Sequence, residues 1–265
     1  MSEDFTATKL KGHKGSVTCL QHNAQEQTLL SGSEDQTVRL WDLRTQQTAK
    51  CMAGFVADIE AVRYGYDKNV VHVATSNALL SYDLRFEGLL TREPLSQVNF
   101  SEGGDEVSSI ALNSKGDTLA VAMDSGVINL LSMKNTGLFC ENAGATRYKR
   151  LTRVHSNIVS TIQFKKNNPR ELLSGGFDYI GCVWDIDKGR PKASTVFQLL
   201  PNEDAESNKM QLVNPPFVMH LQYMMDGRCI AAALGDGTVS FIHTNMLVIE
   251  SKAVPSRAVK YARVC

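Results

Sequence analysis

Two sets of residues in this sequence have the side chains of a serine hydrolase, and the members of each set are spaced alike. Each set holds a histidine, a serine and an aspartate, in that order: His13, Ser31 and Asp35; His155, Ser174 and Asp178. In such an enzyme the histidine takes a proton from the serine, and the carboxylate orients the imidazole. Neither serine lies in a G-x-S-x-G turn, which would expose a nucleophile. We therefore interpret both sets as structural hydrogen-bonded networks and keep a hydrolase that uses His13 or His155 as a rival hypothesis.

Other chemistry finds little support in the sequence. It contains no G-x-x-x-x-G-K-[ST] loop and no G-x-G-x-x-G before a helix, so nucleotide cofactors are not expected. The six cysteines form no C-x-x-C pair, which argues against a zinc site and against a disulfide framework. His72, His220 and His243 stand singly, whereas a metal site needs clustered ligands. We expect no cofactor and no metal.

The charge balance also limits the partners. Lys+Arg and Asp+Glu are both 28 in 265 residues, and a net charge of zero gives no reason to expect binding to nucleic acid. The basic stretch 147–155 carries Arg147, Lys149, Arg150 and Arg153 and could contact phosphate, but the zero net charge favours a solvated loop between blades. The sequence has no apolar run long enough to span a membrane, and its N-terminus lacks the apolar centre of a secretory signal. We expect a cytoplasmic or nuclear protein with reduced thiols.

An internal repeat organises the chain. Residues 29–42, LLSGSEDQTVRLWD, align without a gap with residues 172–185, LLSGGFDYIGCVWD, and weaker copies occupy 70–83, 119–132 and 229–242. The last large side chain of each copy is equivalent: Trp41, Tyr82, Leu131, Trp184 and Ile242. Short runs of β-branched and aromatic residues, separated by Gly, Asn and Asp, predict strands joined by tight turns. The sequence therefore predicts an all-β protein with negligible helix.

These units resemble WD repeats, and the resemblance covers the whole chain. It implies a β-propeller, in which four-stranded blades are arranged around an axis. It also implies that a histidine, a serine, an aspartate and a tryptophan form a buried chain of hydrogen bonds within a blade, which adds Trp41 and Trp184 to the two sets above. The other units depart from this pattern, with Ser76 and Ser125 at the aspartate position and Ile242 at the tryptophan position. We expect those blades to depend on apolar packing alone.

The repeat divides the chain into one propeller domain of five units and part of a sixth. The approximate units are 11–52, 53–98, 99–150, 151–210 and 211–252, with residues 253–265 resembling the first strand of another unit. Propellers of this family commonly have seven blades. The resemblance therefore implies either a shortened ring whose closure is defective or five blades that close by themselves.

One segment resembles a more specific motif. Residues 29–44 match the box of WD proteins that recruit substrates to cullin-4 RING ubiquitin ligases, and the box ends in Trp-Asp-x-Arg, here with Asp42 and Arg44. The next unit ends with Asp83 and Arg85 at the same positions, whereas the fourth unit has Asp187 in place of the arginine. The resemblance implies a non-enzymatic scaffold that binds proteins or peptides, and whose four rim residues contact the ligase adaptor. The alternative is a generic chromatin or signalling scaffold without a ligase partner.

Overall fold

The strands of the computed structural model form five sheets, in which every pair of neighbouring strands is antiparallel except one parallel pair in the first sheet. The structure describes residues 8–100, 104–133, 147–197, 215–224, 227–244 and 249–253, and over these residues it contains strands and turns but no helix. The first two sheets consist of β1 (Val17–Asn23), β2 (Thr28–Ser33), β3 (Val38–Asp42), β4 (Gln47–Met52) and β8 (Leu90–Thr91); and of β5 (Ile59–Tyr64), β6 (Val70–Thr75), β7 (Ala78–Asp83) and β9 (Ser96–Asn99).

The remaining three sheets follow the same order of strands. They consist of β10 (Val107–Leu112), β11 (Thr118–Met123), β12 (Ile128–Ser132) and β13 (Arg147–Leu151); of β14 (Thr161–Lys165), β15 (Asn168–Gly175), β16 (Ile180–Asp185) and β17 (Arg190–Val196); and of β18 (Val218–Tyr223), β19 (Cys229–Leu234), β20 (Val239–His243) and β21 (Ile249–Ala253). Each sheet is called a blade below, from first to fifth. This architecture confirms the predicted all-β fold of five blades. The proposed start of a sixth unit lies outside the described residues, apart from Ala253.

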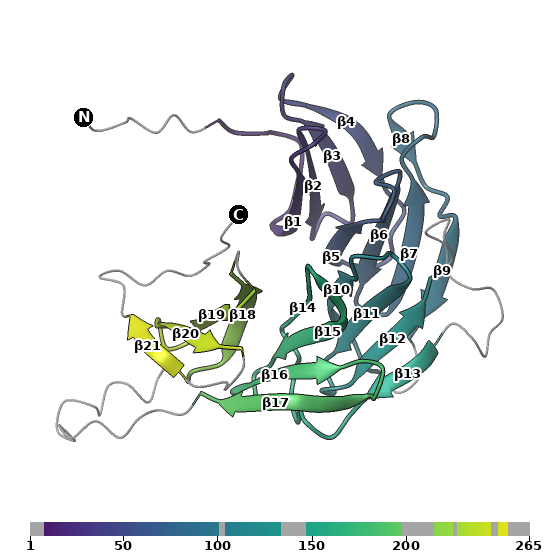
Figure 1. The fold of residues 1–265 in the computed structure, drawn as a ribbon. Helices are drawn as coiled ribbons and strands as arrows, with labels where there is room; N and C mark the ends of the chain where they lie inside the picture. Colours follow the sequence, from purple (N-terminus) through teal and green to yellow (C-terminus); the bar gives the residue numbers. More distant parts are fainter. Residues whose placement is uncertain are drawn as a thin grey trace, which may run out of the picture.

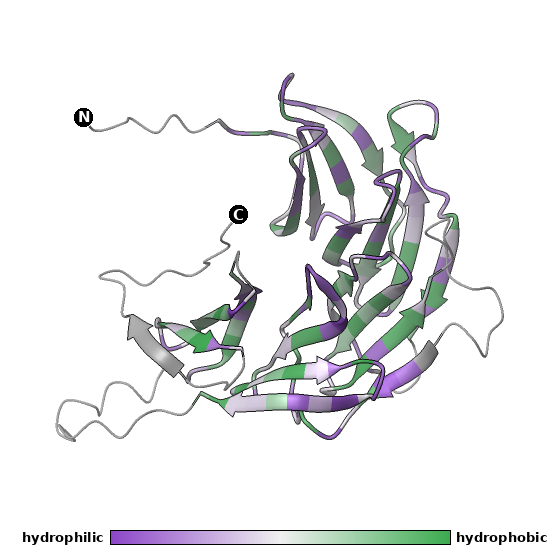
Figure 2. Cartoon of the chain, in the orientation of Figure 1, coloured by the Kyte–Doolittle hydropathy of each residue, from purple (hydrophilic) through white to green (hydrophobic). Residues whose placement is uncertain are grey.

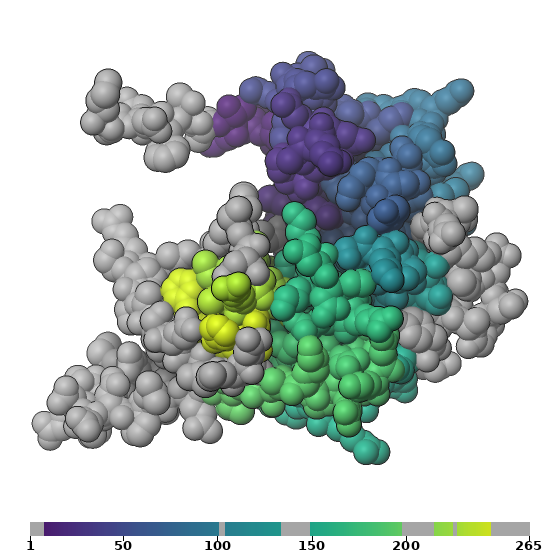
Figure 3. All heavy atoms as spheres, in the orientation of Figure 1, coloured from purple at the N-terminus to yellow at the C-terminus, as the bar shows by residue number. Residues whose placement is uncertain are grey.

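The blades follow one another along an arc. The innermost strands β1, β5, β10, β14 and β18 contact one another in chain order, and Figure 1 shows the five sheets arranged around a common centre. In Figure 3 the colours pass from purple through teal to yellow around the molecule, so neighbours in the chain are neighbours in space. The first and the fifth blades lie at the two ends of the arc (Figure 1).

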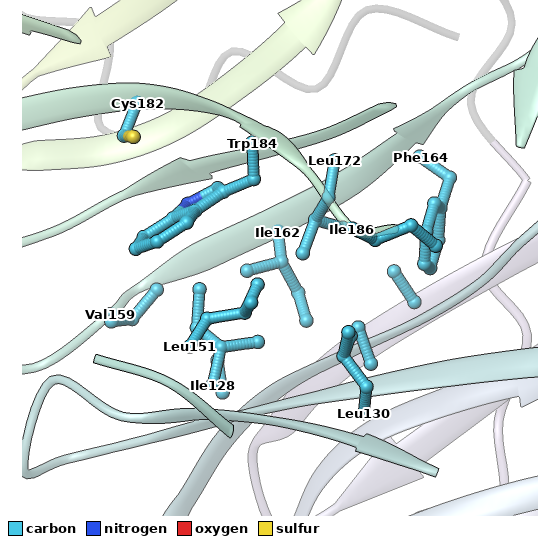
Figure 4. Packing of buried hydrophobic residues seen from close by; sticks show 13 residues of the cluster. Ile128, Leu130, Leu151, Val159, Ile162, Phe164, Leu172, Cys182, Trp184 and Ile186 are labelled. Carbon is cyan, nitrogen blue, oxygen red and sulfur yellow. The ribbon is translucent and has the colours of Figure 1, made fainter. Parts of the chain in front are cut away.

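Apolar side chains lie on the strands and form the layers between blades. In Figure 2 the strands carry most of the hydrophobic residues, while the turns are largely hydrophilic. Figure 4 shows the layer between the third and fourth blades, where Ile128, Leu130 and Leu151 meet side chains of the next blade, among them Ile162 and Trp184. The second, third and fourth blades therefore each bury one face against the preceding blade and the other face against the following blade.

A hydroxyl on the innermost strand links each of three blades to the next. Thr18 Oγ1 donates a hydrogen bond to the carbonyl of Ile59, Ser108 Oγ donates to the carbonyl of Val159 at 2.8 Å, and Ser160 Oγ donates to the carbonyl of Val218. The three acceptors occupy equivalent positions in their blades, the position that Val17 has in the first blade. The link between the second and third blades differs, because Glu60 takes the equivalent position.

The outer face of the first blade is open to solvent. Val17 and Leu20 are 48% and 41% exposed, whereas Leu221, which occupies the position of Leu20 in the fifth blade, is 2% exposed. The equivalent residues of the second blade, Ile59 and Val62, are both fully buried. The reason is that every blade except the first has a preceding blade to cover this face.

This difference predicts unequal costs for the same substitution. Leu221→Ala should destabilise the 265-residue chain by about 2–4 kcal/mol, because it removes a buried side chain and leaves a cavity. Leu20→Ala should cost about 1 kcal/mol or less, because that side chain already contacts water. Urea denaturation of both variants checks this, and equal losses of stability would contradict the packing described above.

Glu60 supplies a prediction about pH. Burial raises the pKa of Glu60, and the carboxylates of Asp58 and Glu106 raise it further. A raised pKa means that the folded chain favours the protonated form, so stability from this group is present below about pH 4 and is lost as the pH rises through the folded pKa. Glu60→Gln should therefore be more stable than wild type at pH 7, by about 1 kcal/mol or less for a partly exposed group.

The measurement is the melting temperature of wild type and Glu60→Gln between pH 3.5 and 8, values chosen to span roughly the titration of a glutamate. The advantage of the variant should shrink toward the acidic end. Glu34→Gln, a change at an exposed position nearby, is the control and should give a smaller gain. An advantage that stays constant over the whole range would contradict the role given to the charge of Glu60.

Candidate functional site

In the first blade, the histidine, serine, aspartate and tryptophan of the repeat form one chain of hydrogen bonds. Ser31 lies on β2 and Trp41 on β3, and Trp41 Nε1 donates to Ser31 Oγ at 2.8 Å. His13 connects this pair to Asp35: its Nε2 lies 2.6 Å from Ser31 Oγ, and its Nδ1 lies 3.0 Å from Asp35 Oδ2. Trp41 is 3% exposed and Ser31 2%. The network therefore ties the segment before β1 and the turn between β2 and β3 to the centre of the blade.

The fourth blade contains the same arrangement with nearly the same distances. Trp184 Nε1 donates to Ser174 Oγ at 2.7 Å, and His155 Nε2 lies 2.7 Å from Ser174 Oγ. His155 Nδ1 lies 3.1 Å from both carboxylate oxygens of Asp178. Ser174 is fully buried. Each of these two blades thus holds four polar side chains in its interior with a partner for every one.

The direction of the hydrogen bonds can be assigned from the partners. The carboxylate of Asp178 accepts only, so Nδ1 of His155 carries a proton and Nε2 accepts from the hydroxyl of Ser174. The hydroxyl oxygen then accepts from the indole N–H of Trp184. A nucleophilic serine must reach a substrate carbonyl, but this serine is enclosed and its oxygen already has two partners. The arrangement has the order of a hydrolase triad without access for a substrate.

The hydrogen bonds also set the ionisation of the two aspartates. Burial by itself raises the pKa of Asp35, but hydrogen bonds from Thr37, from the backbone N–H of Lys14 and from His13 outweigh it and bring the pKa down to about 2. For Asp178 burial again acts upward, while hydrogen bonds from His155 and from the backbone N–H groups of Ser156 and Ile180 leave the pKa below its ordinary value. Both carboxylates are therefore ionised at neutral pH.

The expectation that the other blades depend on apolar packing alone is wrong for the second and third blades. His72 is fully buried on β6, and its Nδ1 lies 2.8 Å from Ser81 Oγ on β7. In the third blade Ser125 stands at the aspartate position and donates to Asp105, with its backbone N–H at 2.9 Å from Oδ1 and its hydroxyl at 2.5 Å from Oδ2.

In the first, third and fourth blades a carboxylate joins the turn between the second and third strands to the loop before the first strand, and this carboxylate can come from either side. In the first and fourth blades the turn supplies the aspartate. In the third blade the loop supplies it and the turn supplies the donor. The sequence signal for this exchange is an aspartate about twenty residues before a serine in the turn, which is too common to be recognised without coordinates.

At the end of β3, Asp42 holds both the backbone and the side chain of Arg44. The backbone N–H of Arg44 donates to Asp42 Oδ1 at 2.9 Å, and the guanidinium donates to both carboxylate oxygens at 3.1 and 3.2 Å. The Arg44 side chain is 68% exposed. The hydrogen bonds and the positive charge of Arg44 hold the pKa of Asp42 below its ordinary value.

The end of β7 repeats this geometry in the second blade. The backbone N–H of Arg85 donates to Asp83 Oδ1 at 2.8 Å, and its guanidinium Nε and Nη2 bond the carboxylate at 2.9 and 2.6 Å. The Arg85 side chain is 67% exposed. Because equivalent strands of successive blades run in the same direction, Arg44 and Arg85 lie on the same face of the arc. Each presents a guanidinium whose orientation is fixed by its own aspartate.

The rim of the fourth blade carries a different set of charges. Asp187 occupies the arginine position and pairs with Arg170 at 3.0 Å. Lys149, from the basic stretch before the fourth blade, donates its Nζ to the carbonyls of Ile186 and Asp187 at 2.8 and 2.6 Å. The interpretation of this stretch as a solvated loop is therefore wrong for residues 147–151, which form β13 with Leu151 fully buried, because the strand completes the third blade and packs against the fourth.

The described residues contain neither a metal-binding cluster nor a membrane-spanning helix. There, histidine, cysteine and acidic side chains form no cluster of three or more that could hold a metal ion. Over the same residues no helix has the length and apolar character needed to cross a membrane. The described cysteines Cys19, Cys51 and Cys182 are buried and form no disulfide bond.

One known protein family matches a segment that includes most of the first blade. Residues 5–42 match the family described as WD domain, G-beta repeat. The match covers β1 to β3 of the first blade, and the other four blades repeat the same order of strands.

Three known proteins are similar to longer or shorter parts of the chain. The chain is 28% identical over 244 residues to the WD repeat-containing protein 53 homolog of Dictyostelium discoideum, which covers 88% of this chain and 63% of that protein. It is 26% identical over 190 residues to the nuclear distribution protein nudF of Emericella nidulans, covering 70% of this chain and 39% of that protein. A shorter match, 33% over 109 residues, covers 38% of this chain and 16% of the probable E3 ubiquitin ligase complex SCF subunit sconB of Talaromyces stipitatus. This chain thus spans less than two thirds of each of these relatives.

The buried network predicts the effect of removing one carboxylate. Asp178→Ala should destabilise the chain by about 1–3 kcal/mol at neutral pH, because the buried donor of His155 is left without its acceptor. The pKa of Asp178 is lowered on folding, so its contribution is present above about pH 4 and is lost as the pH falls through the folded pKa. The difference from wild type should therefore shrink in acid.

Thermal unfolding between neutral pH and roughly pH 3, below the ordinary pKa of an aspartate, measures this difference. The matched control is Asp124→Ala, which removes a carboxylate from the equivalent turn of the third blade. Burial and the charges of Glu106 and Asp105 raise the pKa of Asp124, so its removal should cost nothing at neutral pH. Equal effects of the two substitutions would show that the network does not stabilise the fourth blade.

Proposed function

We propose that this WD-repeat scaffold is a substrate receptor of a cullin-4 RING ubiquitin ligase, and that Asp42, Arg44, Asp83 and Arg85 bind the ligase adaptor. The observation that carries the proposal is the repetition of one built arrangement at the ends of β3 and β7. In both blades an aspartate fixes an exposed guanidinium through two side-chain hydrogen bonds and one backbone hydrogen bond. The end of the first blade matches the Trp-Asp-x-Arg ending of the recruiting box, and the end of the second blade, with Tyr82 in place of the tryptophan, keeps the Asp-x-Arg part.

The geometry suits recognition better than stability. An exposed ion pair between neighbours in a turn contributes little to folding. A guanidinium has five N–H donors in a planar fork, and its own aspartate engages only part of them. The remaining N–H groups can bind carbonyl or carboxylate oxygens of a partner. Because the fork is already oriented, binding loses less side-chain entropy than it would with a free arginine.

Two other functions are considered. A generic chromatin or signalling scaffold would have the same propeller but no contact with the adaptor, and the matches to the nuclear distribution protein and to the SCF subunit, each over part of its length, do not distinguish between them. A hydrolase that uses His13 or His155 finds no support in the site, since both serines are enclosed. Location in the cytoplasm or nucleus stays a prediction.

The test is a binding measurement with purified adaptor. Arg44→Ala should weaken binding by about thirtyfold or more, as truncation of a central interface arginine commonly does, and so should Arg85→Ala. The double variant should show no binding at micromolar concentration. Its melting temperature should stay within about two degrees of wild type, because both side chains are exposed.

Two controls make the outcome specific. Arg170→Ala removes an arginine of similar exposure that pairs with Asp187 on the rim of the fourth blade, and it should leave adaptor binding unchanged. Replacing Arg44 and Arg85 by lysine keeps the charge but not the planar fork, so affinity should still fall. If wild type does not bind the adaptor, or if the double variant binds as well as wild type, the receptor proposal fails and the generic scaffold remains.

A further inference from the structure

The connection between β7 and β9 is much longer than the corresponding turns of the first and fourth blades. It comprises residues 84–95, whereas residues 43–46 join β3 to β4 and residues 186–189 join β16 to β17. Part of it leaves the second blade and crosses to the outer edge of the first, where β8 pairs with β4 in parallel. Figure 1 shows β8 beside β4. The first blade thus has five strands, and its neighbour supplies the fifth.

Hydrogen bonds to β4 hold this connection in place. Lys50 on β4 donates its Nζ to the carbonyls of Phe86 and Gly88 at 2.6 and 2.9 Å, and it lies 4.5 Å from the centre of the Phe86 ring. The backbone N–H of Cys51 donates to the carbonyl of Leu89 at 2.6 Å. A long connection that crosses to another blade and is fixed there is typical of functional loops.

Residues 86–95, the leucine segment, present apolar side chains to solvent. Leu89, Leu90 and Leu95 are 56%, 48% and 48% exposed, and β8 is coloured as hydrophobic in Figure 2. Complete burial of one leucine side chain contributes about 1.5–3 kcal/mol. Three leucines left in water on an ordered segment are a surface that a partner can stabilise.

The leucine segment is continuous with the proposed adaptor contact. It begins directly after Arg85, whose fork is fixed by Asp83 at the end of β7. It returns to the same blade at Leu95, whose backbone N–H donates to the carbonyl of Ser81 at 2.7 Å. Both ends of the segment therefore lie beside the end of β7. A partner that binds Arg85 lies next to the leucine segment.

We infer that the leucine segment is a second contact for the same ligase adaptor. The adaptor covers Leu89, Leu90 and Leu95 with an apolar segment, and carboxylate or carbonyl oxygens beside that segment accept from Arg85. Such an interface has an apolar centre next to a charged rim, which is the usual arrangement in protein complexes. This inference rests on the proposed function, because it names the same partner.

The experiment compares the wild-type chain with the triple variant Leu89→Ser, Leu90→Ser and Leu95→Ser. The hydrogen bonds that fix the segment involve backbone carbonyls and Lys50, so the variant keeps them. Affinity for purified adaptor, measured by calorimetry or interferometry, should fall at least tenfold. A control chain with Val196→Ser and Met224→Ser changes apolar residues of similar exposure, 48% and 44%, on the fourth and fifth blades. Its affinity should not change.

Hydrogen–deuterium exchange supplies a second readout. Adaptor should slow amide exchange in residues 86–95 of wild type beyond the level in the free chain. If the triple variant binds as tightly as wild type, or if the control chain loses as much affinity, this inference is overturned while the arginine proposal stands. If wild type does not bind the adaptor, both are overturned. Loss of binding in the arginine double variant alone, with no protection of the segment, also overturns this inference only.

Discussion

Each sheet of this protein must have both faces covered, and the rest of the structure follows from that requirement. One four-stranded sheet carries apolar residues on two sides, so it is stable only between two neighbours. The inner strands bring the blades into contact, and hydroxyls of Thr18, Ser108 and Ser160 fix the spacing by donating to carbonyls of the next repeat. Val17 and Leu20 are exposed because, among the described residues, no blade packs against this face of the first blade.

Packing between blades does not hold the turns and loops at the ends of the strands. Contacts within each blade hold them. A carboxylate does this by joining a turn to the preceding loop, and it tolerates burial because donors surround it. The first and fourth blades place that carboxylate in the turn at Asp35 and Asp178, whereas the third places it in the loop at Asp105. In all three blades a hydrogen-bonded donor and acceptor join the turn to the loop. Which of the two segments supplies the donor differs between blades.

The features that recur in every unit could be predicted from the sequence. The features that occur in a single blade could not. The aligned segments fix the register of β2 with β3 and of β15 with β16, because a shift of one residue would turn Trp41 and Trp184 out of the core. The sequence could not reveal that residues 90–91 would join the first blade, since a two-residue strand has no periodicity. It also gave no sign of the bond between Asp105 and Ser125, which depends on loops meeting in space.

The candidate interaction surface combines a feature of two neighbouring blades, the Asp-x-Arg turn, with a feature of one connection, the leucine segment. Equivalent positions of successive blades lie on one face, so a turn ending in Asp-x-Arg in two neighbouring blades presents two oriented guanidiniums there. The fold does not need either arginine, as the fourth blade holds its rim with Asp185 and Asp187 instead. It does not need the leucine segment either, because the first and fourth blades connect the same strands with short turns. Features that the fold can omit, but that are held in fixed positions where they occur, are those for which a binding partner is the simplest physical explanation.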